Sequence, residues 1–140
     1  MMISTKGRYA LRVMLDLAKH TEGYLSLKDV AEAQEISMKY LEAITARLHR
    51  AGLVLSHRGK EGGYALARAA NRITVAEILR CAEGTLVPVS CPSLEGDACS
   101  RSGDCLTLPL WQALGEQIDT YLSAVTLEDV LLGRLKGESQ

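Results

Sequence analysis

Residues 37–66, SMKYLEAITARLHRAGLVLSHRGKEGGYAL, decide the expected fold because two different patterns follow one another within them. Behind Ser37, a residue type that caps helix N-termini, apolar residues recur at helical spacing. Two short apolar runs follow, at residues 53–55 and 64–66, and a glycine-rich turn with two cations separates them. An amphipathic helix that leads directly into two short strands predicts a helix followed by a wing.

Helical patterns also lie on both sides of this stretch. The expected helices cover residues 4–20, residues 26–34, residues 37–51 and residues 73–82. Two short helices joined by a tight polar turn, of which the second is fully amphipathic, indicate a helix-turn-helix. The expected fold class is therefore mostly α: a winged helix-turn-helix with a small two-stranded wing and a long C-terminal helix.

Charge is distributed unevenly along the chain, although the net charge is only −1. Residues 1–80 carry 13 Lys and Arg against 8 Asp and Glu, whereas residues 81–140 carry 3 against 9. A basic half can bind a polyanion that an acidic half repels. The absence of Phe and the single Trp disfavour a stacking platform for single strands, so duplex DNA is the favoured polyanion. Chance variation of surface charge would give the same asymmetry.

If duplex DNA is the partner, residues 37–51 form the recognition helix, whose exposed N-terminal end meets base edges. A carboxylate is unfavourable near phosphates, so Glu42 is expected to accept from cytosine or to penalise other bases. The alternative for Glu42 is an ordinary solvated side chain. The alternative for each cation is that it only makes the surface soluble. The expected DNA-contacting residues are Lys6, Lys39, Tyr40, Glu42, Ala43, Arg47, Arg50, Arg58 and Lys60.

Three cysteines lie in or beside a segment, residues 83–104, that has no sustained periodicity. Seven residues separate Cys91 from Cys99, and five separate Cys99 from Cys105. These spacings match neither paired zinc knuckles nor a C-x-x-C redox motif. Three thiolates on one loop suit a soft metal centre such as an iron–sulfur cluster, and ordinary loop thiols are the alternative. Cys81, in an amphipathic helix, is expected to pack as a small apolar side chain.

Beyond the cysteines, apolar residues step by 3, 4, 3 and 4 positions, which is an a/d heptad seam. The seam residues are Trp111, Leu114, Ile118, Tyr121 and Val125. Such a narrow stripe favours a symmetric helix pair between two chains over packing within one chain. The expected regions are therefore a winged helix-turn-helix over 1–82, a cluster-binding loop over 83–104, and a dimerisation helix with a short C-terminal helix over 105–140.

Several classes of protein are excluded. No apolar run approaches the roughly 20 residues that a membrane span requires, and the N-terminus lacks the apolar core of a signal peptide. A cytoplasmic location, where structural disulfides are rare, is therefore expected. No nucleophile elbow, HExxH motif or dinucleotide fingerprint is present, which indicates that the chain is not an enzyme.

Five motifs together resemble the Rrf2 family of winged-helix regulators over almost the whole chain. They are residues 4–10 (STKGRYA), 40–42 (YLE), 52–54 (GLV), 58–64 (RGKEGGY) and 126–129 (TLED). The resemblance implies a homodimer that binds palindromic promoter DNA. It also equates Cys91, Cys99 and Cys105 with the three cysteines of the cluster-binding branch, whose cluster is either [2Fe-2S] or [4Fe-4S].

The fourth ligand of such a cluster is not identified by the resemblance. Leu108 stands where one group of cluster-binding members has a histidine, and Arg8 stands where another group has an aspartate. Asp97, Asp104, an exogenous ligand and an open iron site are the alternatives. The implied function is a repressor that senses iron, redox state or nitric oxide. A cluster-free repressor of cysteine metabolism that responds to thiols or metabolites is the alternative, whereas the basic wing disfavours an iron–sulfur carrier without a DNA role.

Overall fold

The structure is a computed structural model that describes residues 3–96 and 103–135. Its elements are α1 (Thr5–Lys19), α2 (Leu27–Gln34), α3 (Met38–Arg50), β1 (Val54–His57), β2 (Gly63–Leu66), the short 3-10 helix η1 (Ala70–Arg72), α4 (Val75–Glu83), α5 (Leu108–Ala124) and α6 (Leu127–Leu132). The mostly helical fold with a two-stranded wing is thereby confirmed. None of the described helices has both the length and the hydrophobicity needed to cross a membrane.

Hydroxyl side chains explain where five of the helices begin. Ser4, Ser26 and Ser37 each accept a hydrogen bond from a backbone N–H of the first helical turn. Thr74 and Thr126 go further and form complete capping boxes with the acidic residue at the third helical position. These caps are local, which is why the sequence predicts most helix starts to within a residue or two.

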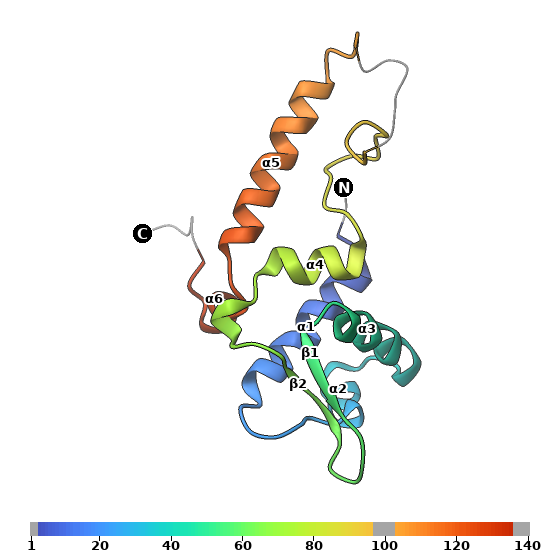
Figure 1. The fold of residues 1–140 in the computed structure, drawn as a ribbon, viewed down its shortest axis with the longest axis vertical. Helices are drawn as coiled ribbons and strands as arrows, with labels where there is room; N and C mark the ends of the chain where they lie inside the picture. Colours follow the sequence, from blue (N-terminus) through green and yellow to red (C-terminus); the bar gives the residue numbers. More distant parts are fainter. Residues whose placement is uncertain (1–2, 97–102, 136–140) are drawn as a thin grey trace.

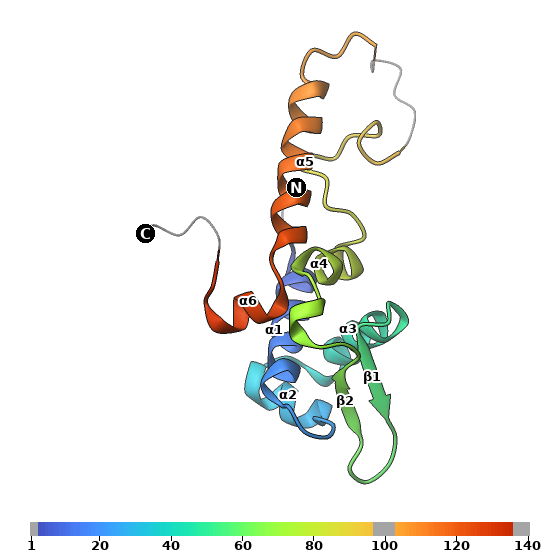
Figure 2. The same cartoon turned by 60° about the vertical axis from the view of Figure 1, so that its left-hand side comes forward.

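The main hydrophobic core lies where α1, α3, α4 and α6 meet. Its largest fully buried side chains include Met14 of α1, Leu41 and Leu48 of α3, Ile78 of α4 and Leu127 of α6. Burial of such side chains is worth roughly 1.5–3 kcal/mol each and dominates the stability of the fold. In Figures 1 and 2, these helices and the wing form one body, from which α5 extends away.

The backbone at Leu25, just before α2, anchors the wing to this body. β1 and β2 pair antiparallel, with Val54 opposite Leu66. Tyr64 also exchanges two backbone hydrogen bonds with Leu25, each with an N–O distance of 2.9 Å. A Cβ at Gly63, which has a φ of +156°, would overlap the Leu25 carbonyl group. Gly63 is therefore required for the close approach that fixes the wing.

The heptad interpretation is wrong at its last position. α5 ends at Ala124, and Val125 begins an extended turn into α6. Val125 is 4% exposed and packs in a second core cluster with Val75 and Ala76 of α4. Its backbone carbonyl accepts a hydrogen bond from Val75 N–H. The helical period on which the seam depends stops before Val125, so this side chain stabilises the chain's own core.

Candidate DNA-binding surface and cysteine segment

One exposed stripe runs along α3. Lys39, Glu42 and Ala43 are exposed on its first half, and Arg47 and Arg50 on its second half. Residues three and four apart share a face of a helix, so α3 brings these five predicted contacts together. The opposite face is buried in the main core, which fixes the rotation of the helix and keeps the stripe outward.

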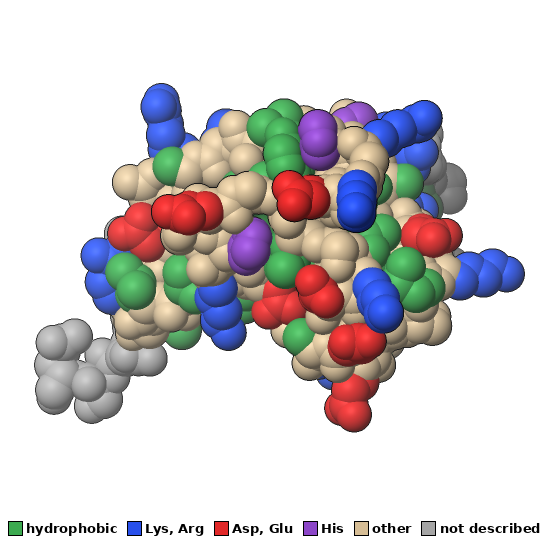
Figure 3. Space-filling view, turned by 90° about the horizontal axis from the view of Figure 1, so that it is seen from below, with side chains coloured by type: hydrophobic (Ala, Val, Ile, Leu, Met, Phe, Trp, Pro, Cys, Tyr) green, Lys and Arg blue, Asp and Glu red, His purple; other side chains and the backbone are tan. Residues whose placement is uncertain are grey.

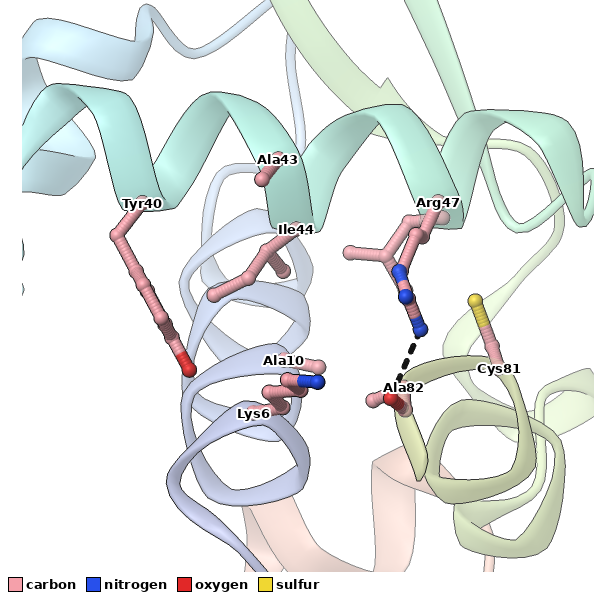
Figure 4. A pocket seen from close by; sticks show the side chains of 9 residues that line it. Lys6, Ala10, Tyr40, Ala43, Ile44, Arg47, Cys81 and Ala82 are labelled. Carbon is pink, nitrogen blue, oxygen red and sulfur yellow. Dashed lines mark hydrogen bonds between the residues drawn. The ribbon is translucent and has the colours of Figure 1, made fainter. Parts of the chain in front are cut away.

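Tyr40 has a position different from that of its neighbours. Its ring is half-buried and packs edge-on against Tyr9 of α1, with 5.6 Å between ring centroids and 87° between planes. Arg12 lies over the Tyr9 ring, 5.3 Å from its centroid. Tyr40 therefore also holds the start of α3 against α1, and its hydroxyl end extends toward α1 (Figure 4).

Arg47 crosses from α3 to the end of α4. Its guanidinium donates a hydrogen bond to the Ala82 carbonyl oxygen at 3.2 Å (Figure 4). The side chain of Lys6, in the first turn of α1, reaches into the same region. The structure thus brings Lys6, Tyr40 and Arg47 together between three helices, beside the exposed stripe of α3.

Arg58 and Lys60 lie in the turn between β1 and β2. Both side chains are exposed, and the wing projects away from the helices in Figures 1 and 2. Tyr24 stacks on His57 at the base of the turn, with 4.9 Å between ring centroids. This contact, which the sequence did not predict, supports β1 just before the two cations.

The predicted DNA-contacting cations have no acidic partner within the described residues. The ion pairs found there join Arg68 to Glu77, Arg80 to Asp119, and Arg134 to Glu128 and Asp129. Lys and Arg side chains on the face shown in Figure 3 are interspersed with acidic and histidine side chains. The face is therefore mixed in charge, and a polyanion would meet separate cations there.

Of the cysteine segment, residues 83–104, the structure describes residues 83–96 and 103–104. Cys91 is half-buried at the start of a turn, where its carbonyl accepts hydrogen bonds from the N–H groups of Leu94 and Glu95. Cys105 is half-buried just before α5, with its Sγ 3.3 Å from Thr107 Oγ1. Cys99 and Asp97 lie outside the described residues. Asp104 is exposed.

The thiol donors fit an iron–sulfur cluster in their chemistry, because such clusters are held by cysteine thiolates. In residues 3–96 and 103–135, no three His, Cys, Asp or Glu side chains converge as a metal site. Cys81 is set apart from this segment, since it packs against the main core. Partial burial raises the pKa of the Cys81 thiol, although the nearby charges of Arg47 and Arg50 oppose this effect.

Part of the predicted seam is uncovered. Leu114 and Tyr121 of α5 are exposed, and Trp111 and Ile118 are half-buried. Leu110, on the same helix, is also exposed. An apolar helix face of this kind is the usual composition of a dimer interface.

Two links between helices have no signal in the sequence. Glu83 at the end of α4 accepts hydrogen bonds from Ser4, and Arg80 of α4 forms an ion pair with Asp119 of α5. In each link, the two partners are far apart in the chain, so no local pattern predicts the contact. Together they connect α4, which precedes the cysteine segment, to α1 and to α5, which follows it.

Comparisons with known proteins identify the family. The model of the Rrf2 family, described as an iron-dependent transcriptional regulator, matches residues 3–132. The HTH-type transcriptional regulator IscR of Xenorhabdus nematophila is 42% identical over 132 residues, which cover 94% of this chain and 79% of that protein. Solved structures of CymR (YrzC), the global cysteine regulator of B. subtilis, and of T. potens IscR are each 38% identical and match with TM-scores of 0.78 and 0.76. They cover 95% and 100% of this chain, and the matches span 98% and 93% of those chains. The expectation that the chain is not an enzyme agrees with these relatives, which are transcriptional regulators. This chain therefore belongs to the Rrf2 family of transcriptional regulators.

Proposed function

We propose that this chain is a homodimeric repressor that binds palindromic promoter DNA and is controlled by an iron–sulfur cluster on Cys91, Cys99 and Cys105. The observation that supports DNA binding is the exposed stripe of α3, because this helix leads directly into the cationic wing (Figure 1). In this proposal, the first turns of α3 meet base edges in the major groove through Lys39, Tyr40, Glu42 and Ala43. The remaining cations contact phosphates, and Arg58 or Lys60 reaches the minor groove or backbone.

Dimerisation is proposed through the seam residues of α5 without Val125. Two recognition helices must be spaced by about 34–36 Å, one turn of DNA, for both half-sites to be read together. The regions proposed for DNA binding, cluster binding and dimerisation remain 1–82, 83–104 and 105–140. The placement of α5 relative to α3 then determines which spacing the dimer can match.

The cysteine segment is suited to changing that placement. The chain between α4 and α5 contains this segment, with Cys91 eight residues after Glu83, the end of α4, and Cys105 three residues before Leu108, the start of α5. A bound cluster would supply iron–thiolate bonds that oxidants, nitric oxide or iron scarcity break. With those bonds present, the three cysteines hold the segment in one conformation. The fourth position is proposed to be filled by Asp97, Asp104 or an exogenous group, or to be left as an open iron site.

The chain's own contacts would carry this change to the DNA-binding surface. The Arg80–Asp119 ion pair links α4 to α5, and the Glu83–Ser4 hydrogen bonds link α4 to the first turn of α1, which carries Lys6. A change in the order of the segment therefore acts on both the dimer geometry and a proposed phosphate contact.

Two measurements on the full chain test this function separately. Iron and sulfide analysis of anaerobically purified protein tests cluster binding, and stoichiometric iron and sulfide are expected. A gel-shift titration with DNA from upstream of the chain's own gene tests specific binding, because such regulators often control their own operon. Binding no tighter than to a scrambled fragment of equal length would contradict the DNA role.

A second candidate function is a cluster-free repressor of sulfur or cysteine metabolism that responds to thiols or metabolites. The similarity to CymR, a cysteine regulator at 38% identity, favours it. Specific DNA binding by protein that lacks iron and sulfide after anaerobic purification would support this candidate over the cluster-controlled repressor.

A further inference from the structure

A small cavity lies between α1, α3 and α4, directly beside the exposed stripe of α3 (Figure 4). Its volume is about 120 Å³. The walls come from three helices and are almost entirely apolar. The apolar wall residues are Ala10, Ala43, Ile44, Leu48, Cys81 and Ala82. We call this cavity the α3 pocket.

Positive charge is concentrated at the edge of the α3 pocket. Lys6 reaches in from α1, and Arg47 and Tyr40 reach in from α3 (Figure 4). Within residues 3–96 and 103–135, neither Lys6 nor Arg47 forms an ion pair, and the Tyr40 hydroxyl makes no hydrogen bond. Arg47 uses one N–H group to donate to the Ala82 carbonyl, and its other N–H groups are available to an anion.

The Cys81 thiol points from α4 toward α3 and forms part of the apolar wall (Figure 4). Because burial raises the pKa of this thiol, it is protonated at neutral pH and does not repel an anion. A protonated thiol is also a weak nucleophile, which argues against a covalent adduct at Cys81. The chemistry of the pocket therefore selects a ligand with one charged end and an apolar body.

We propose that the α3 pocket binds a small organic carboxylate with an apolar body, whose carboxylate pairs with Lys6 and Arg47. A cavity of about 150 Å³ takes up benzene, so about 120 Å³ fits an apolar body of about four to six carbons. The planar guanidinium of Arg47 matches a carboxylate in geometry. Lys6 and Arg47 are both exposed, so the carboxylate beside them remains partly hydrated.

The ligand has a regulatory consequence that rests on the proposed DNA-binding function. Lys6 and Arg47 are proposed phosphate contacts, and the same two cations cannot fully neutralise a carboxylate and a phosphate at once. Carboxylate binding is therefore expected to compete with DNA. At a ligand concentration of about ten times its own dissociation constant, mutual exclusion lowers DNA affinity about tenfold.

Binding is tested first without DNA. Sodium isovalerate is titrated into the ¹⁵N-labelled full chain, and saturable shifts of the amides of Ala10, Ala43 and Ala82 are expected. Isoamyl alcohol has the same carbon skeleton without the charge, and inorganic phosphate has charge without the apolar body. Each is expected to bind at least fivefold more weakly than isovalerate. No saturable shift with isovalerate, or equal shifts with the alcohol, would overturn the proposal.

A pair of variants at one position tests the location. Cys81→Leu fills the pocket and is expected to abolish the isovalerate shifts, whereas Cys81→Ala leaves the space open and should retain them. If Cys81→Leu does not fold, Ala43→Leu fills the pocket from the opposite wall in the same DNA-free titration. Isovalerate binding that is unchanged in a folded, filled variant would place the ligand elsewhere.

The regulatory step is then measured as competition by isovalerate against a fluorescent promoter duplex. The expected tenfold weakening should be absent in Cys81→Leu. Failure of the wild-type chain to bind the duplex at all would contradict the proposed function but leave the DNA-free titration intact. If isovalerate binds but does not change the affinity for the duplex, the proposed competition is wrong, and the proposed DNA binding is unaffected.

Discussion

The carboxylate of Glu83 accepts hydrogen bonds from both the backbone N–H and the hydroxyl of Ser4, at 2.6 and 2.7 Å, across 79 residues of chain. Glu83 is the last residue of α4, and Ser4 is the N-cap of α1. A carboxylate beside a helix N-terminus satisfies exposed donors and interacts favourably with the helix dipole. Gly7 makes this approach possible, because a Cβ there would lie 2.5 Å from Glu83 Oε2.

Glu83→Ala is expected to lower the free energy of unfolding by about 1–2 kcal/mol, because the Ser4 donors lose their acceptor. Urea denaturation followed by circular dichroism measures the change. Glu95→Ala removes an exposed carboxylate and serves as the matched control, with little expected effect.

Gly7→Ala is expected to destabilise the wild-type chain more than the Glu83→Ala background, because its new methyl group displaces the Glu83 carboxylate. The coupling in this double-mutant cycle should be about 0.5 kcal/mol or more. Strictly additive losses would mean that the two sites do not interact.

Stability is expected to depend on pH through Glu77. Partial burial alone would raise the pKa of Glu77, but the hydrogen bond from the Thr74 backbone and the Arg68 guanidinium outweigh it, so the pKa lies below its ordinary value of 4.5. A carboxyl with a lowered folded-state pKa stabilises the fold above its unfolded-state pKa, and this stabilisation is lost as pH falls through the folded-state pKa. Glu77→Gln should therefore be less stable than wild type at neutral pH.

The difference between Glu77→Gln and wild type should shrink as pH is lowered past about 4.5. Urea denaturation of both proteins over a series of pH values from neutral to acidic measures it. A difference that stays constant through this range would show that the charge of Glu77 contributes nothing.

Lys60→Ala is expected to weaken binding to specific and scrambled duplexes by similar factors, because an exposed wing cation contacts phosphate without reading sequence. The slope of log affinity against log salt should fall by about one. Fluorescence anisotropy over a range of salt concentrations measures both quantities. Arg134→Ala removes a cation that is paired with Glu128 and should leave the slope unchanged.

Glu42→Ala is expected to broaden sequence preference with little loss of affinity for the best site, because the removed carboxylate rejects some bases more than it attracts others. Selection of sites from a random duplex pool measures the preference. Each affected position should lose about 1–3 kcal/mol of discrimination. Selected sites identical to those of wild type would show that Glu42 is only a solvated surface residue.

Cys99→Ala is expected to abolish the visible absorbance of an iron–sulfur cluster but to leave a folded dimer, because the α5 seam needs no metal. Affinity for at least one promoter should then change roughly 5–150-fold, the usual range of allosteric coupling. Cys81→Ala, at a partly buried position that packs against the core, should retain the absorbance and lose only modest stability. Full absorbance in Cys99→Ala, or unchanged binding to every promoter, would contradict the sensor.

The proposed DNA-binding surface was largely predictable because its signals are local. Ser37 caps α3, and the apolar period behind it decides which face of the helix is buried and therefore which residues are exposed. The glycine-rich turn likewise places Arg58 and Lys60 in the wing. Tyr40 was predicted as a DNA contact, but only the structure shows that its ring packs on Tyr9 of another helix.

By itself, the sequence determined most helix starts, the wing and the apolar period of α5, because capping, turn chemistry and periodicity act over a few residues. Only the tertiary structure decided that Glu83 reaches Ser4, that Leu25 pairs with Tyr64 and that Val125 turns inward. The same is true of the α3 pocket, whose walls come from three helices. These contacts join segments that are distant in the chain, and their geometry depends on how the helices pack around the shared core rather than on the residues next to them.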